Sequence, residues 1–221
     1  MDFPGDISTP AVLPLTSAYT QSVFERSGDS DWFRVTLKKN VNYAVQLECN
    51  LGDCSVSVRD RQGGELAQSF GSSDIDTQPG LSLIAPYDGT FFVEARGYQP
   101  RPYRLRMAKD CAEDFRSICT LAANGQGSGN LFSFNDRDWL AIELERGKTY
   151  DAEVRSSNAG IGLSVGVFTK FGGSLQLDSG TSGGGFASFE GFKPRATDRY
   201  FINVSGEYGT GPYRVTVTER R

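Results

Sequence analysis

The chain has 221 residues, of which 38% are apolar and 23% charged, so it is long enough to bury a core and too apolar for a disordered chain. It contains no histidine, which excludes a Ser-His-Asp triad, a Cys-His pair and histidine-ligated metals. The net charge of −4 argues against nucleic acids and anionic membranes as partners. No apolar run reaches the roughly 18 residues that a membrane span needs.

Short strands are the elements that the residue pattern predicts along the chain. Residues 8–15 contain Pro10 and Pro14, which favour an extended segment over a helix. After it, Phe33, Val35 and Leu37 alternate with polar residues, and this period of two is typical of a strand with one buried face. Gly, Asp, Asn and Pro separate further short strands, which are expected at 43–47, 55–58, 81–84, 91–96 and 103–107.

The second half of the chain repeats the first half. Residues 29–37 (DSDWFRVTL) recur as residues 136–144 (DRDWLAIEL), and a tyrosine follows twelve residues after the second aspartate in both copies. Three more matches keep the same order: GGEL with GGSL, FVEARG with FINVSG, and PYRL with PYRV. Four collinear matches at nearly one spacing indicate an internal duplication.

The pattern therefore predicts an all-β protein with two tandem antiparallel β-sandwich domains of jelly-roll-like type. Seven or eight short strands in about 110 residues, without a long segment of helical period, fit this class of fold. The expected domains span residues 1–108 and 109–221.

The four cysteines are Cys49, Cys54, Cys111 and Cys119. Their short spacings favour two local disulfides, Cys49 with Cys54 and Cys111 with Cys119, each within one repeat. Free thiols and a four-thiolate zinc site are the alternatives, although the second spacing is too long for a usual zinc knuckle. Disulfides imply a location outside the cytoplasm.

The order of motifs resembles the bacterial pre-peptidase C-terminal domain family. The resemblance rests on an acidic start at residues 2–6, the strand entry GDSDWF at 28–33, a tyrosine twelve residues after Asp31, and a closing Pro-Tyr strand at 102–105. It covers nearly the whole chain, once in each repeat. The second copy departs from the pattern at its start, where residues 111–114 read CAED. The resemblance implies secreted β-sandwich modules, without catalysis of their own, attached to proteases, collagenases or calcium-dependent repeat proteins.

Calcium is the cofactor that the resemblance and the aspartates together suggest. Ca²⁺ binds six to eight oxygen atoms, and clustered carboxylates repel one another unless a cation neutralises them. The bland alternative is that these aspartates cap turns. The expected ligands are the acidic residues at the start of each repeat and those before its aromatic strand: Asp2, Asp6, Asp29 and Asp31 in the first copy, and Asp110, Asp114, Asp136 and Asp138 in the second.

The tyrosines Tyr98 and Tyr208 occupy equivalent glycine-rich turns and are candidate ligand-binding residues, with packing on their own hairpins as the alternative. We expect a non-catalytic, secreted bacterial module that binds an extracellular polymer, either protein or polysaccharide, or the neighbouring domains of a longer chain. A purely structural spacer is the first alternative. A hydrolase that uses two carboxylates is the second.

Overall fold

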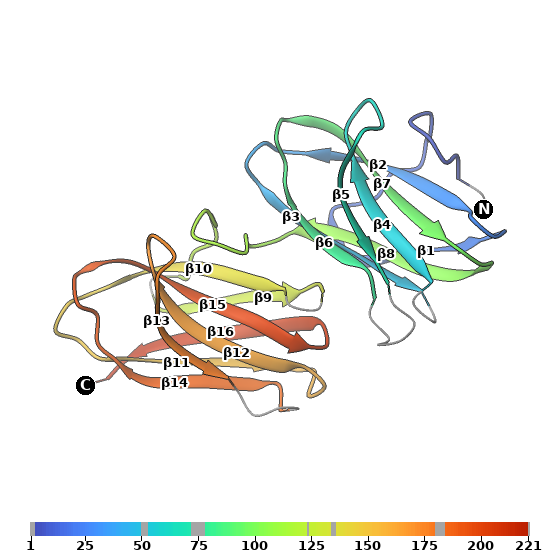
Figure 1. The fold of residues 1–221 in the computed structure, drawn as a ribbon. Coiled ribbons are helices and arrows are strands. Elements are labelled where there is room, and N and C mark those ends of the chain that lie inside the picture. Colours follow the sequence, from blue (N-terminus) through green and yellow to red (C-terminus); the bar gives the residue numbers. More distant parts are fainter. Residues whose placement is uncertain are drawn as a thin grey trace. The chain divides into compact units, whose positions relative to one another are not determined.

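The computed structural model describes residues 3–49, 53–71, 78–122, 124–133, 136–179 and 184–220. It divides into two compact units, Met1–Asp110 and Cys111–Arg221 (Figure 1). The described residues form strands and turns, and among them no helix is long and apolar enough to cross a membrane. Each unit is an antiparallel β-sandwich of two four-stranded sheets, as the residue pattern predicted.

The first unit has sheets with the orders β1-β8-β3-β6 and β2-β7-β4-β5. Its strands are β1 (Thr16–Phe24), β2 (Ser30–Leu37), β3 (Asn42–Cys49), β4 (Cys54–Arg59), β5 (Glu65–Phe70), β6 (Gly80–Ile84), β7 (Gly89–Gly97) and β8 (Arg101–Lys109). All six strands expected from the sequence lie within these bounds, whereas β1 and β5 were not predicted.

The second unit repeats this topology, with the orders β14-β11-β16-β9 and β10-β15-β12-β13. Its strands are β9 (Gln126–Leu131), β10 (Arg137–Leu144), β11 (Tyr150–Ser156), β12 (Gly162–Thr169), β13 (Ser174–Ser179), β14 (Phe186–Phe192), β15 (Asp198–Tyr208) and β16 (Gly211–Glu219). When β9 is matched to β1 and each later strand to its counterpart, the neighbours in the sheets are the same in both units.

The core of each unit lies between its two sheets. In the first unit Phe33, Val35 and Leu37 of β2 point inward and are buried against Val45 and Leu47 of β3. Leu140 and Leu144 of β10 take the same positions in the second unit. The period-two alternation of these strands thus follows from one face packing on the opposite sheet while the other face does not.

A segment before the first strand of each unit adds to the edge of β2 or β10. The amide of Leu13 donates to the Arg34 carbonyl at 3.0 Å, and the Arg34 amide donates to the Ala11 carbonyl at 2.8 Å. In the second unit Leu121 and Cys119 make the same pair of bonds with Ala141. The chain then crosses to the other sheet, where β1 pairs with β8 and β9 pairs with β16. These entry segments bring the acidic start of each repeat towards β2 and β10.

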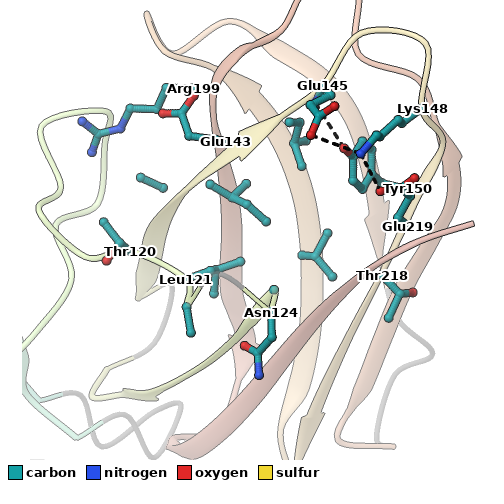
Figure 2. A pocket seen from close by; sticks show the side chains of 16 residues that line it. Thr120, Leu121, Asn124, Glu143, Glu145, Lys148, Tyr150, Arg199, Thr218 and Glu219 are labelled. Carbon is teal, nitrogen blue, oxygen red and sulfur yellow. Dashed lines mark hydrogen bonds and ion pairs between the residues drawn. The ribbon is translucent and has the colours of Figure 1, made fainter.

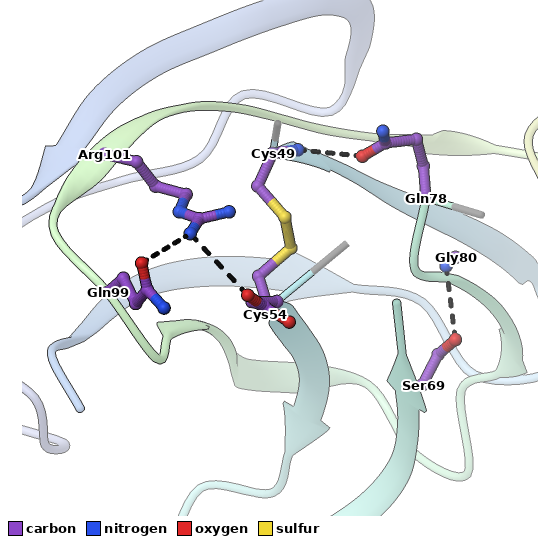
Figure 3. Close-up of a disulfide and its surroundings, with 8 residues drawn as sticks. Cys49, Cys54, Ser69, Gln78, Gly80, Gln99 and Arg101 are labelled. Atoms are coloured by element: carbon purple, nitrogen blue, oxygen red, sulfur yellow. Dashed lines mark hydrogen bonds and ion pairs between the residues drawn. A yellow bond between two sulfur atoms is a disulfide. The ribbon is translucent and has the colours of Figure 1, made fainter. Parts of the chain in front are cut away.

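Two local disulfides join the predicted cysteines, Cys49 with Cys54 and Cys111 with Cys119. The first links the end of β3 in one sheet to the start of β4 in the other, beside Gln78, whose side chain accepts a 2.8 Å bond from the Cys49 amide (Figure 3). The second closes the entry segment of the second unit, where the Cys119 carbonyl bonds to β10.

Candidate metal centres

Three carboxylates meet where β1 ends and β2 begins. Glu25, Asp29 and Asp31 each offer one oxygen atom, and these oxygens lie within 4.8 Å of one another. The turn between the strands passes through Gly28, whose φ of 75° is a left-handed conformation that glycine adopts easily. We call this set the first carboxylate group.

The first carboxylate group is fixed by hydrogen bonds from three parts of the unit. The Glu25 amide donates to Oδ2 of Asp29 at 2.8 Å, which closes the turn. Oδ1 of Asp31 accepts a 3.2 Å bond from the Phe3 amide of the entry segment. Oδ2 of Asp31 accepts a 2.5 Å bond from the buried hydroxyl of Tyr103 on β8. The entry segment and both sheets therefore converge on Asp31.

Burial makes this group electrostatically costly. Asp31 is 0% exposed, and its burial raises the pKa to about 6, although bonds from Tyr103 and Phe3 oppose the rise. The charges of Asp29 and Glu25 raise the pKa of Asp31 further. The guanidinium of Arg26 approaches Asp29 at 3.7 Å, but its side chain is largely exposed and offsets little of this repulsion. A cation among the three carboxylates would remove the cost.

A second carboxylate group forms from Asp110, Asp136 and Asp138, whose oxygens also lie within 4.8 Å of one another. Asp136 repeats the role of Asp29, because its Oδ2 accepts a 2.5 Å bond from the Phe132 amide four residues earlier. The carbonyl groups of Asp29 and Asp136 accept equivalent bonds from Gly97 and Gly206, at 3.0 and 3.1 Å. The two groups therefore share the same backbone frame.

Asp136 differs from an aspartate that only caps a turn. It is 2% exposed, and within the described residues its Oδ1 atom is buried without a hydrogen-bond partner. Burial raises the pKa of Asp136 to about 6 and the charge of Glu113 adds to the rise, although backbone bonds from Phe132, Arg137 and Ser133 oppose it. Buried polar atoms are almost always bonded, so this oxygen is the one in the group that is best placed to accept a further ligand. Ca²⁺ fits because both groups offer oxygen donors of the kind that hard cations prefer.

Two predicted ligands lie outside these groups. Asp6 is exposed and accepts a 2.8 Å bond from the Ser8 amide, and Asp114 accepts one of 2.8 Å from the Arg116 amide. Both residues cap their own turns, which is the alternative to metal binding that the sequence left open for the aspartates. Asp2 lies outside the described residues.

Glu25 joins the first group without having been predicted from the sequence. It lies four residues before Asp29, directly after β1, and copy two has Phe132 at the equivalent position. The spacing could have suggested it only if the end of β1 had been recognised. The third carboxylate of each group therefore comes from a different place in the two repeats.

The two candidate ligand-binding tyrosines have different surroundings. Tyr98 is exposed, and its amide bonds to the Asp53 carbonyl at 3.1 Å. Tyr208 is half-buried, and its ring lies over Gly162, where a Cβ atom would come within 2.3 Å of Cε1. The Tyr208 ring therefore packs on the start of the neighbouring strand β12, and Tyr98 is the more exposed of the two tyrosines.

A pocket of the second unit lies beside β10 and has a volume of about 890 Å³ (Figure 2). Its rim carries Lys148, whose ammonium group pairs with Glu145 at 3.1 Å and Glu219 at 3.0 Å. Hydrogen bonds to Glu219 and Glu145 raise the pKa of Lys148, so it stays charged between them.

No protein-family model and no curated protein matches the sequence. Among solved structures, the pre-peptidase C-terminal domain of collagenase from Bacillus anthracis is 19% identical, with a TM-score of 0.36, over 45% of this chain and 93% of that chain. A domain of the family that the sequence resembles is thus among its structural neighbours.

Two further neighbours have comparable scores. The periplasmic inhibitor of g-type lysozyme from Aeromonas hydrophila is 20% identical over 46% of this chain and 96% of its own, with a TM-score of 0.31. The PBSX exported protein XepA is 11% identical over 99% of this chain and 98% of its own, with a TM-score of 0.30.

Proposed function

We propose that the protein is a non-catalytic extracellular module whose two β-sandwich units are each stabilised by one calcium ion. The observation that carries the proposal is the carboxylate group at the start of β2, with two buried aspartates, which recurs with the same backbone frame at the start of β10. Glu25, Asp29 and Asp31 would hold one ion, and Asp110, Asp136 and Asp138 the other. Carbonyl groups and water would complete the oxygen shell.

In this proposal calcium neutralises the carboxylates and so stabilises the folded form in which they lie close together. Asp31 also accepts a bond from Phe3, so an ion that holds the Asp31 carboxylate in place also holds the entry segment against β2. A ligand that binds only the folded form stabilises it in proportion to the logarithm of the ligand concentration above Kd. Calcium should therefore raise the melting temperature and protect the entry segments from proteases.

An extracellular location is the second part of the proposal. Two disulfides in a chain of this size are typical of proteins that fold in oxidising compartments. We therefore place the protein outside the bacterial cytoplasm.

The partner in this proposal is an extracellular polymer, either protein or polysaccharide. Tyr98 is the candidate that supports it, because its side chain is 44% exposed and an exposed aromatic ring can stack on a sugar or a peptide. The alternative is a rigid spacer between neighbouring domains. It would be favoured if no polymer binds.

Melting curves in EDTA and in millimolar calcium test the ion. We expect calcium to raise the melting temperature of wild type, and to raise that of Asp31→Asn and Asp136→Asn by less. Asp6→Asn is the matched control, because Asp6 caps an exposed turn and should leave the calcium response unchanged. No response to calcium in wild type would remove the ion from the account.

Polymer binding is tested by pull-down on collagen, chitin, cellulose and peptidoglycan. We expect one of them to retain the protein and Tyr98→Ala to weaken the retention, with Tyr208→Ala as the packed counterpart. Retention by none of these polymers would favour the spacer. The two experiments are independent, because a calcium-stabilised spacer would pass the first and fail the second.

A further inference from the structure

The turn between β12 and β13 carries an exposed aromatic side chain. Phe171 is 77% exposed at the tip of this hairpin. The turn is closed by bonds from the Thr169 amide to the Gly173 carbonyl at 2.8 Å and from the Gly172 amide to the Thr169 carbonyl at 2.9 Å. A short hydrogen-bonded turn holds Phe171 outward, where it loses the hydrophobic stabilisation that burial would give.

A second aromatic ring lies against the same turn. A Cβ atom at Gly172 would come within 3.2 Å of Cδ1 of Phe115, and Phe115 is itself 48% exposed. Ile118, three residues later in the same entry segment, is 63% exposed. We call Phe115 and Phe171 the aromatic tip. Contiguous exposed apolar residues of this kind mark interaction surfaces.

Basic residues lie on the turns beside Phe171, whereas Phe115 follows Asp114, which pairs with Arg116. The Lys170 ammonium lies 5.4 Å from the Phe171 ring and pairs with Asp198 at 2.7 Å, which brings the loop at 193–198 to the same end of the unit. The Arg146 amide bonds to Oγ1 of Thr197 at 2.9 Å, so the turn at 145–149 joins them. Five Lys and Arg residues and two acidic residues occupy these three turns, and of the five cations Lys148 pairs with Glu145 and Glu219 and Lys170 with Asp198.

Several of these cations are available to a partner. Arg146, Lys193 and Arg195 are exposed, and no ion pair is recorded for them within the described residues. The net charge of −4 for the whole chain therefore conceals a cationic end in the second unit. Anionic surfaces respond to local charge, because salt screens interactions beyond about 10 Å.

We propose that this end of the second unit docks on an anionic lipid surface, with the aromatic tip in the interfacial layer and the basic turns against the headgroups. Aromatic residues favour the membrane interface, and clustered Lys and Arg residues add attraction to anionic lipids. A fluid surface accepts a protruding ring without a preformed cavity. The charge of the surrounding turns selects lipid over an apolar pocket in another protein.

The first unit provides an internal comparison. Its equivalent hairpin has Gln62 at the position of Phe171, and Ile7 at the position of Phe115. Phe171→Gln therefore replaces the exposed ring by the side chain that the other repeat carries. Because Phe171 is mostly exposed, this substitution should leave the melting temperature unchanged.

Co-sedimentation with vesicles tests the proposal. We expect wild type to bind vesicles of phosphatidylcholine with phosphatidylglycerol at low salt, and to bind pure phosphatidylcholine weakly. Phe171→Gln should bind anionic vesicles about ten-fold more weakly, as expected for one buried aromatic ring. Phe70→Gln is the matched control, because Phe70 is 60% exposed in the first unit and should have no effect. Lys193→Glu with Arg195→Glu should weaken binding and its dependence on salt.

The assay is run in EDTA, so that calcium bridges neither lipid nor protein and the result does not depend on the proposed calcium sites. No binding to anionic vesicles, or equal binding by wild type and Phe171→Gln, would overturn the proposal. Sedimentation equilibrium of the same proteins supplies the competing outcome. A dimer that Phe171→Gln dissociates, together with no lipid binding, would assign the aromatic tip to self-association.

Discussion

The hydroxyl group of Tyr103 on β8 donates a 2.5 Å hydrogen bond to Oδ2 of Asp31 on β2, so it connects the two sheets of the first unit through a buried carboxylate. The ring of Tyr103 also stacks on Phe24 at 4.2 Å between centroids. A tyrosine at the start of the last strand is expected to be buried and hydrogen-bonded, as Tyr103 is, but the sequence did not identify Asp31 and Phe24 as its partners. The candidate metal site is therefore part of the structural core.

Tyr103→Phe should lower the free energy of unfolding by about 1.5–3 kcal/mol, the usual range for a hydrogen bond to a charged group. The substitution keeps the ring and its stacking on Phe24, so it isolates the hydroxyl. Denaturant titration in EDTA measures the change. Tyr98→Phe is the control, because Tyr98 is exposed. Equal stability of Tyr103→Phe and wild type would show that the bond to Asp31 does not stabilise the fold.

Removal of the first disulfide should also be destabilising. Cys49 and Cys54 close a loop with a sequence separation of five residues, for which chain entropy gives about 2 kcal/mol. Cys49→Ser with Cys54→Ser should lower the unfolding free energy by that amount, as measured by urea titration. The pair Cys111→Ser with Cys119→Ser should cost about as much, because its loop is only slightly longer. A variant as stable as wild type would contradict the entropic account.

The sequence was informative about the strands with a buried apolar face and much less about the strands that are mostly exposed. Phe33, Val35 and Leu37 alternate because the inner face of β2 packs on the opposite sheet. The missed strand β1 places Thr20 and Ser22 on its inner face, and β5 is mostly exposed. Edge strands that bury little apolar surface carry no periodic signal, so only their hydrogen bonds define them.

The candidate site was predictable to the same partial degree. Asp29, Asp31, Asp136 and Asp138 precede aromatic strands in both repeats, and local sequence identifies them. Glu25 was missed because its approach to Asp31 depends on how β1 ends. Asp6 and Asp114 were included because they are acidic and near the start of each repeat, but each caps its own turn. Proximity between segments is a tertiary property that the motif alone does not contain.

A pH titration of stability tests the cluster around Glu94 on the outer face of the sheet that contains β2. Burial would raise the pKa of Glu94, but bonds from Ser30, Arg59 and Ser57 outweigh it and hold the pKa below its usual value. A carboxylate with a lowered folded pKa stabilises the protein above its unfolded pKa of about 4.3, and this stability is lost as the pH falls through the folded value.

Glu94→Gln should therefore be less stable than wild type at neutral pH, and the difference should shrink as the pH is lowered below about 4. Urea titrations of both proteins across this range measure it. Arg59 approaches Glu94 at 2.6 Å, so the neutral amide also leaves the guanidinium without its charged partner. A stability difference that does not change with pH would contradict the assignment of the lowered pKa to Glu94.

The number of calcium ions bound per chain is the most direct measure of the central claim, and native mass spectrometry counts them. We expect two ions on wild type and one each on Asp31→Asn and Asp136→Asn, because each variant removes a buried ligand from one group. The double variant should hold none. Wild type without bound calcium, or the same number of ions on wild type and both single variants, would contradict the assignment of these carboxylates.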